Sequence, residues 1–108
     1  MDTTKIRQLN DALRTTLKGG KILVTSGFSA LPVGTKADAY GAIVTFDKFD
    51  DENNDPYKEH DFGAVEIDGE KIFWKIDYYD KSMEAGSEDP SDPSQTTRVL
   101  TIMLAEEY

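Results

Sequence analysis

The chain of 108 residues has no cysteine, a single histidine and no long hydrophobic run. Without cysteine there is no disulfide framework, thiolate nucleophile or cysteine-type zinc site. One histidine cannot supply the ligands that a zinc centre needs. No apolar run reaches the roughly 18 residues of a membrane helix, and the N-terminal MDTTKIRQLND lacks the apolar region of a secretory signal. We therefore expect a cytoplasmic protein without a membrane segment, metal site or cofactor.

The hydrophobic content is nevertheless sufficient for one core. Apolar residues make up 38% of the chain, and 11 residues are aromatic. A chain of this length and composition matches one domain of ordinary size. We predict a single domain that spans residues 1–108.

Charge is distributed unevenly along the chain. The net charge is −9. Residues 1–46 hold six Lys/Arg and three Asp/Glu, which gives +3, whereas residues 47–108 hold six and 18, which gives −12. Nucleic-acid affinity rests on Lys and Arg that neutralise phosphates, so direct nucleic-acid binding is disfavoured. The acidic excess either keeps the protein soluble or forms a surface for a basic partner.

Two helices are predicted in the first half of the chain. Ile6, Leu9, Leu13 and Leu17 recur at helical spacing within residues 3–20. A short strand is expected within residues 21–28, where Ser26 and Gly27 end it. Residues 34–49 then favour a second helix with Thr35 and Asp38 as a capping pair, although Gly41 and the β-branched residues that follow it suit a strand.

The strongest local pattern is a β-hairpin around Asp68-Gly69, the preferred dipeptide of a two-residue type I′ turn. Counting outward from this turn pairs Ile67 with Glu70, Glu66 with Lys71 and Val65 with Ile72. This register predicts a core face made of Val65, Ile67, Ile72, Trp74, Ile76 and Tyr78. The opposite face is amphipathic: it is either partly covered by a loop or available to a partner.

The last part of the chain reads as a long loop followed by a strand. Residues 81–95 contain Gly86, Pro90 and Pro93 and are typical of a functional or mobile loop. The closing TTRVLTIMLAEEY fits a helix or a strand, and we favour a strand because it extends the sheet. The expected fold is α+β, with two helices on one face of an antiparallel sheet of about four strands.

Several segments carry a resemblance to a known family. The runs NDPYKEHDFGAVEIDGEKIFWKIDYYD and GSEDPSDPSQTTRVLTIMLAEEY, together with the N-terminal IRQLNDALR, resemble short bacterial proteins that share the domain of unknown function 3768. The resemblance implies a bacterial origin, often among genes of plasmids and other mobile elements. It implies no established activity and supplies no catalytic residues.

Motifs for catalysis or metal binding are weak. His60 beside Asp61 suggests a general base with an orienting carboxylate, but neighbours in sequence seldom face each other. A structural or surface histidine is the favoured interpretation. The alternation of Asp51, Asn53, Asp55 and Glu59 fails as a calcium loop, because proline and phenylalanine occupy the places of the required glycine and glutamate.

Two functional hypotheses follow. The first is a small acidic interaction protein that presents a negative surface to a basic partner, such as a nuclease or a restriction or CRISPR-type effector, and thereby acts as a counter-defence inhibitor for a mobile element. The second is a small bacterial enzyme that uses His60, Asp61 and nearby carboxylates for acid–base chemistry. The partner-binding residues predicted by the first are carboxylates of the two polar segments: Asp50, Asp51, Glu52, Asp55, Glu59, Asp61, Glu84, Glu88, Asp89 and Asp92.

Overall fold

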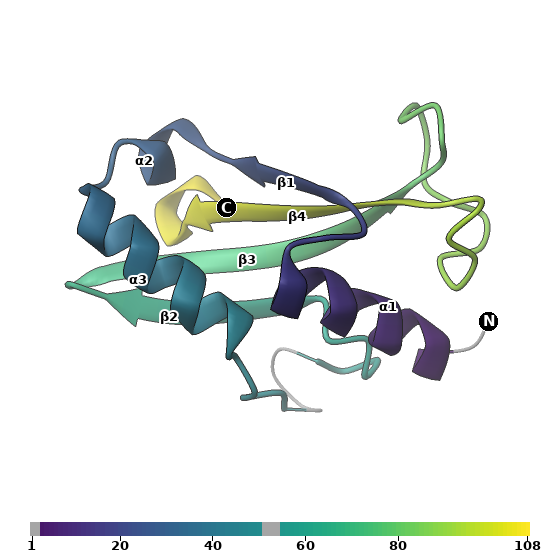
Figure 1. Cartoon of the computed structure of the whole chain (residues 1–108), viewed down its shortest axis with the longest axis horizontal. Helices are drawn as coiled ribbons and strands as arrows, with labels where there is room; N and C mark the ends of the chain where they lie inside the picture. Colours follow the sequence, from purple (N-terminus) through teal and green to yellow (C-terminus); the bar gives the residue numbers. More distant parts are fainter. Residues whose placement is uncertain (1–2, 51–54) are drawn as a thin grey trace.

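A computed structural model describes residues 3–50 and 55–108. Helices and a four-stranded sheet form an α+β fold, as the sequence predicts, and α1 and α3 lie on the same face of the sheet (Figure 1). The elements are α1 (Thr3–Thr16), β1 (Lys21–Val24), α2 (Ser26–Ser29), α3 (Val33–Val44), β2 (Phe62–Ile67), β3 (Glu70–Tyr79), β4 (Thr97–Leu104) and the 3₁₀ turn η1 (Ala105–Glu107).

The sheet is mixed, so the prediction of an antiparallel sheet is wrong. Its strand order is β1-β4-β3-β2, and β1 runs parallel to β4 while the other pairs are antiparallel. Parallel pairing places Val24 beside Ile102, at the end of β4 away from the 80–96 loop. The three consecutive apolar residues of β1, Ile22, Leu23 and Val24, suit a strand that runs in either direction, so the sequence pattern carries no information about it.

The β2–β3 connection follows local sequence rules. Asp68 and Gly69 have φ angles of 52° and 81°, and two positive values are what a type I′ turn requires. Glu66 pairs with Lys71, and Val65 pairs with Ile72, as the count from the turn predicts. Opposite charges therefore meet on one face and β-branched side chains on the other.

The core lies between the two long helices and the sheet. On β3, Ile72, Trp74 and Ile76 are buried as predicted, and Trp74 is 0% exposed. Val65, Ile67 and Tyr78 are partly buried and pack against the same core. Leu100 and Ile102 of β4 complete the apolar surface of the sheet. The main apolar cluster therefore lies on the face that both long helices cover, whereas Val99 and Met103 of β4 are buried outside this cluster.

Helix α1 contributes both apolar and polar side chains to the interior. Ile6 and Leu13 are buried, whereas Leu9 and Leu17 are only partly so. The helix ends at Thr16, and Leu17 follows with a φ angle of 59°. The periodic leucines located this helix correctly.

A four-residue helix, α2, replaces the second half of the predicted 21–28 strand, so the exact number of helices differs from the expectation. The strand ends at Val24 because the Thr25 side chain accepts a hydrogen bond from the backbone N of Phe28 (3.4 Å) and caps a helical turn. The Glu107 carboxylate accepts hydrogen bonds from the Thr25 hydroxyl (2.5 Å) and from the backbone N of Gly27 (3.0 Å). The C-terminal turn η1 therefore holds α2 in place.

Helix α3 forms where the second helix was expected, with different ends. It begins at Val33 and has Pro32 at the N-cap position, with no side-chain capping bond. The Thr35 hydroxyl donates to the Asp68 carboxylate (2.8 Å) and thus fixes the helix to the β2–β3 turn, so the predicted capping pair of Thr35 and Asp38 does not form. The helix stops at Val44, before residue 49.

No α-helix of residues 3–50 and 55–108 covers the opposite face of the sheet (Figure 1). Phe62 and Phe73 pack there against Tyr108, with ring centroids 5.2 to 5.8 Å apart. The end of the chain therefore covers part of this amphipathic face. Among the helices in residues 3–50 and 55–108, none has the length and apolar character needed to cross a membrane.

Candidate functional site between helix α1 and the acidic segments

Polar side chains of α1 are buried beside its apolar ones. Asn10 is 0% exposed and Arg14 is 4% exposed, and both lie close to the buried Leu13. A buried polar group is costly unless it is hydrogen-bonded. We call the connected group of polar side chains around these two residues the polar cluster; it consists of Asn10, Asp11, Arg14, Asp55, Glu59, His60, Tyr78 and Arg98.

Asn10 is the centre of the polar cluster. Its Nδ2 donates to the backbone oxygen of Glu59 (2.9 Å) and to the hydroxyl of Tyr78 (2.8 Å). Its Oδ1 accepts from Nε of Arg98 (2.8 Å). The Arg98 guanidinium also donates to the backbone oxygen of Pro90. One side chain of α1 therefore links the 55–61 segment to the 80–96 loop.

Tyr78 and Glu59 form a partly buried pair within the cluster. The Tyr78 hydroxyl donates to Oε1 of Glu59 (2.6 Å). Burial and this bond raise the pKa of Tyr78, so the phenol stays protonated at neutral pH. The Arg98 guanidinium lies 5.3 Å from the centre of the tyrosine ring. Burial lowers the pKa of Arg98, and its hydrogen bonds to Asn10 and Pro90 compensate for part of the lost hydration.

His60 is enclosed by two carboxylates and an aromatic ring. Its Nδ1 lies 2.9 Å from Oδ1 of Asp11, and its Nε2 lies 3.6 Å from Oδ2 of Asp55. The imidazole stacks on Phe49 with a centroid distance of 3.7 Å. The contacting carboxylates are thus those of Asp11 and Asp55, not that of the neighbouring Asp61. Since both ring nitrogens already face carboxylates, this geometry suits a residue that anchors the segment to α1.

Arg14 joins the two long helices. Its Nη1 donates to the backbone oxygens of Ile43 (3.0 Å), Val44 (3.3 Å) and Phe46 (2.9 Å) at the end of α3. Its guanidinium carbon lies 5.4 Å from the centre of the Phe49 ring and 5.6 Å from that of Trp74. A cation at the C-terminus of a helix binds the unpaired carbonyl groups and opposes the helix dipole. Arg14 therefore caps α3 from a neighbouring helix.

Asp61 is the carboxyl group best suited to acid–base chemistry. Burial, with a further contribution from the charge of Glu59, raises its pKa to about 6. A carboxyl group with such a pKa exchanges protons near neutral pH. Asp61 belongs to the enzymatic hypothesis, but the other residue of that hypothesis, His60, faces different carboxylates.

The ten predicted partner-binding carboxylates fall into distinct environments. Asp50, Glu84 and Glu88 are exposed, Glu59, Asp61, Asp89 and Asp92 are half-buried, Asp55 is buried, and Asp51 and Glu52 lie outside the described residues. Asp55 is 2% exposed, and its carboxylate accepts a hydrogen bond from the backbone N of His60 (2.9 Å). It therefore anchors its own segment and does not contribute to an exposed surface.

Two carboxylates of the 80–96 loop shape that loop. Oδ1 of Asp89 accepts from the backbone N (3.1 Å) and the hydroxyl (2.5 Å) of Ser91. Oδ1 of Asp92 accepts the same pair of bonds from Ser94, at 2.8 and 2.7 Å. The Ser94 hydroxyl bond is the main cause of the lowered pKa of Asp92. Aspartates that bond to residues two positions ahead are typical of stable turns.

The two acidic segments, which sequence analysis could not place in space, meet at one end of the sheet through Asn10 and Arg98. The residues that join them, Asn10 and Arg98, are not among the site residues predicted from the sequence. A signal was present for Asn10 and Arg14, which lie on the same side of the helix as the periodic leucines. Polar residues on an apolar face predict a buried hydrogen-bond network. Arg98, a basic residue inside an apolar strand, gives a similar signal.

A family model described as a protein of unknown function, DUF3768, matches residues 24–107. The chain belongs to this family. The matched part of the DUF3768 protein includes the 55–61 segment, Tyr78, the 80–96 loop and Arg98, but not α1, which supplies Asn10 and Arg14. The comparisons found no matching curated protein and no matching solved structure.

Proposed function

We propose that this DUF3768 protein is an acidic interaction protein rather than an enzyme. The observation that carries the proposal is the connection of the two acidic segments: Asn10 bonds to Glu59 on one side and to Arg98 on the other, and Arg98 bonds to Pro90 of the 80–96 loop. Carboxylates that are distant in sequence thereby contribute to one end of the molecule. Such a surface attracts and orients a basic partner.

The exposed members of this surface are the ones that a partner can reach. Glu84 and Glu88 are exposed, while Glu59 and Asp61 are half-buried. The net charge of −12 in residues 47–108 adds a long-range attraction. We propose that the partner is a nucleic-acid-binding protein, such as a nuclease or a restriction or CRISPR-type effector, because its phosphate-binding surface is basic. A counter-defence role for a mobile element is compatible with this partner.

The surroundings of His60 support binding over catalysis. Its ring is stacked on Phe49, and its nitrogens face Asp11 and Asp55. A general base needs a nitrogen within hydrogen-bond reach of a substrate. The contacts of this histidine instead hold the 55–61 segment against α1, where the segment contributes its carboxylates to the acidic end.

Affinity capture tests the proposal with matched variants. The immobilised wild-type protein is compared with the double variant Glu84→Gln/Glu88→Gln and with the control Asp38→Asn/Glu106→Gln. Both variants lose two charges at exposed positions, but the control positions lie on α3 and after β4. A bacterial lysate is applied at low salt, and bound proteins are eluted at high salt and identified.

We expect capture of a nucleic-acid-binding protein whose affinity falls with ionic strength. Loss of two exposed charges is expected to weaken it about fivefold in the Glu84/Glu88 variant, with no comparable loss in the control. The captured protein should also release duplex DNA when the wild-type protein is added. Equal weakening by both variants, or capture of nothing basic, would reject the acidic surface. Turnover of a substrate that His60→Asn abolishes would favour the enzyme.

A further inference from the structure

Strand β1 lies at an edge of the sheet. It pairs with β4 on one side, and no strand of residues 3–50 and 55–108 lies on its other side. The backbone N of Thr25 donates to the backbone oxygen of Ile102 (3.1 Å). Alternate residues of a strand bond to the same neighbour, so Lys21 and Leu23, like Thr25, direct their backbone N–H and C=O groups toward β4. Ile22 and Val24 therefore direct theirs away from β4. These groups form a template for a further strand.

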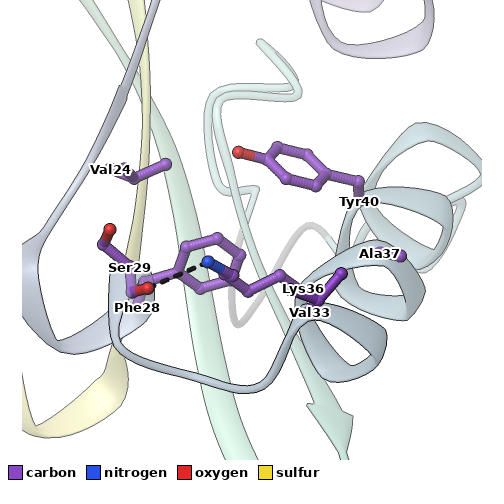
Figure 2. A pocket seen from close by; sticks show the side chains of 7 residues that line it. All are labelled: Val24, Phe28, Ser29, Val33, Lys36, Ala37 and Tyr40. Carbon is purple, nitrogen blue, oxygen red and sulfur yellow. Dashed lines mark hydrogen bonds between the residues drawn. The ribbon is translucent and has the colours of Figure 1, made fainter.

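An apolar pocket adjoins this edge. It is a cavity of about 390 Å³ between β1, α2 and α3. Figure 2 shows Val24 on one side and Val33, Ala37 and Tyr40 of α3 on the other, with Phe28 between them. Phe28 is fully buried and packs edge-on against Tyr40 with ring centroids 5.7 Å apart. The base of the pocket is therefore closed by packed aromatic rings, whereas its rim is accessible because Val33 is 80% exposed.

Polar groups at the pocket could orient a ligand. Nζ of Lys36 donates to the backbone oxygen of Ser29 (2.9 Å), as the dashed line in Figure 2 shows. An ammonium group has three donors, so this contact leaves donor capacity for a second acceptor. The Tyr40 hydroxyl points across the pocket in the same view. An apolar cavity with a few convergent polar groups is typical of a binding site.

We infer that this groove binds an extended segment of a partner protein, which adds to β1 as a strand and places an apolar side chain in the pocket and a carboxylate beside Lys36. The backbone groups of Ile22 and Val24 provide the ladder. Side chains of an added strand point alternately to the two faces of the sheet, so one of them enters the pocket on the helix-bearing face. Strand addition with pockets for alternate side chains is an established mode of peptide recognition.

Charge favours a foreign acidic segment over a second copy of this chain. Residues 21–40, which include β1 and the residues that line the pocket, have Lys21, Lys36 and Asp38 as their charged side chains, a net charge of +1, and Lys21 lies on β1 itself. A symmetric pair through β1 would bring two such basic edges together, and each copy carries a net charge of −9. A partner segment that combines an apolar residue with a carboxylate is complementary in both respects.

This groove is independent of the acidic surface. Parallel pairing places Val24 beside Ile102, near the C-terminal end of β4, whereas the 80–96 loop precedes the N-terminal end of the same strand. The inference therefore does not rest on the proposed function. Either site can fail its test without affecting the other.

A selection on the full chain tests the inference. A random seven-residue peptide library is selected on the wild-type protein and counter-selected on Val33→Glu, which places a charge at an exposed rim position. Expected winners carry an apolar residue close to an acidic one. A winning peptide is then measured by fluorescence polarisation against Val33→Glu and Lys36→Met. The controls are Tyr57→Glu, at an exposed aromatic residue outside the pocket lining, and Lys81→Met.

We expect Val33→Glu to weaken binding about tenfold or more, because it opposes burial of an apolar side chain, and the two control variants to bind as the wild type does. Lys36→Met should weaken binding of the acidic peptide but not binding of the same peptide with its carboxylate replaced by an amide. Methylation of alternate backbone nitrogens of the peptide should abolish binding, because it blocks the strand ladder. Amide shifts on binding should centre on Ile22 and Val24.

Three results would overturn the inference. The first is a library without any sequence enriched on the wild type over Val33→Glu. The second is binding that tolerates backbone methylation, since strand addition would then be absent. The third is a concentration-dependent dimer that Val33→Glu dissociates, which would assign the groove to a second copy of the chain.

Discussion

Gly63 is the position where one added methyl group should disturb the core most directly. A Cβ atom at Gly63 would lie 2.5 Å from Nε1 of Trp74 and 2.8 Å from Cζ of Phe46. Favourable contacts between such atoms begin at about 3.5 Å, so at least one ring must move by roughly 1 Å. Trp74 is 0% exposed, and Phe46 and Phe49 pack edge-on against it. We therefore expect Gly63→Ala to lower the free energy of unfolding by about 2 to 3 kcal/mol.

Urea unfolding followed by far-ultraviolet circular dichroism measures this loss, and Gly41→Ala provides the control. Gly41 is exposed within α3, and a Cβ atom there would have no neighbour within 4 Å among the described residues. The same substitution should stabilise the protein at this position by about 0.5 to 1 kcal/mol, because alanine favours the helix. The two variants make the same chemical change and should differ in sign.

A double-mutant cycle with Trp74→Phe identifies the cause. In the described part of the chain Nε1 of Trp74 has no hydrogen-bond partner, so the smaller phenylalanine ring breaks no hydrogen bond while it vacates space beside Gly63. The cost of Gly63→Ala should fall below about 1 kcal/mol in that background. An equal cost with and without Trp74→Phe would refute the explanation by a clash.

Three further perturbations test the core and the polar cluster. Trp74→Ala should cost about 3 to 5 kcal/mol in thermal or urea unfolding, and a wild-type-like transition would mean that the assigned core face is wrong. Arg14→Met should lower the free energy of unfolding by about 3 kcal/mol, because three carbonyl groups lose their cationic donor. It should also speed amide hydrogen exchange in the last turn of α3. Unchanged exchange in that turn would contradict the capping role. The pKa of Asp61, raised to about 6 from 3.8, means that the folded state holds the extra proton between these values. Stability therefore falls as pH rises through this window. Since the carboxyl group is half exposed, we expect Asp61→Asn to be more stable than the wild type at pH 7 by only about 1 kcal/mol, with the difference vanishing toward pH 4; a pH-independent difference would count against burial as the cause.

The β2–β3 register and helix α1 could be predicted from the sequence, because residues close together in the chain determine them. The pairing of Glu66 with Lys71 follows from the positions of Asp68 and Gly69, because a two-residue turn sets the register of both strands. Helix α1 follows from leucines spaced three and four residues apart. The strand character of β4 was harder to recognise, since threonine, valine and isoleucine decided it only by propensity.

Strand direction was not predictable in the same way. The three consecutive apolar residues of β1, Ile22, Leu23 and Val24, suit a strand that runs either parallel or antiparallel to β4. The deciding contacts are distant in sequence: Thr25 and Gly27 bind the Glu107 carboxylate and bring the end of β1 to the end of β4. No short window of sequence contains both partners of these bonds.

The polar cluster escaped prediction for a related reason. Acidic residues were assigned to surface loops from composition, but Asp55 is buried because a histidine and the backbone of its own segment bind it. Asn10 and Arg98 are separated by 88 positions and meet only in the folded chain. Burial of a polar residue depends on the partner that satisfies it, and that partner is a property of the tertiary structure.

The direction of β1 also determines how the two proposed surfaces are arranged. With β1 parallel to β4, Val24 lies beside Ile102, at the end of the sheet remote from the 80–96 loop. An antiparallel β1 would instead bring Val24 and its apolar pocket toward Val99 and the acidic loop. There, the negative charge of residues 47–108 would repel the acidic segment that Lys36 is suited to bind. The parallel arrangement separates the apolar groove and its Lys36 from the acidic end, so that, under the two proposals, one small domain contacts two partners of opposite charge. A higher salt concentration should strongly weaken partner binding at the acidic end. It should weaken peptide binding in the groove less, since backbone hydrogen bonds and apolar burial contribute most of the affinity of the groove.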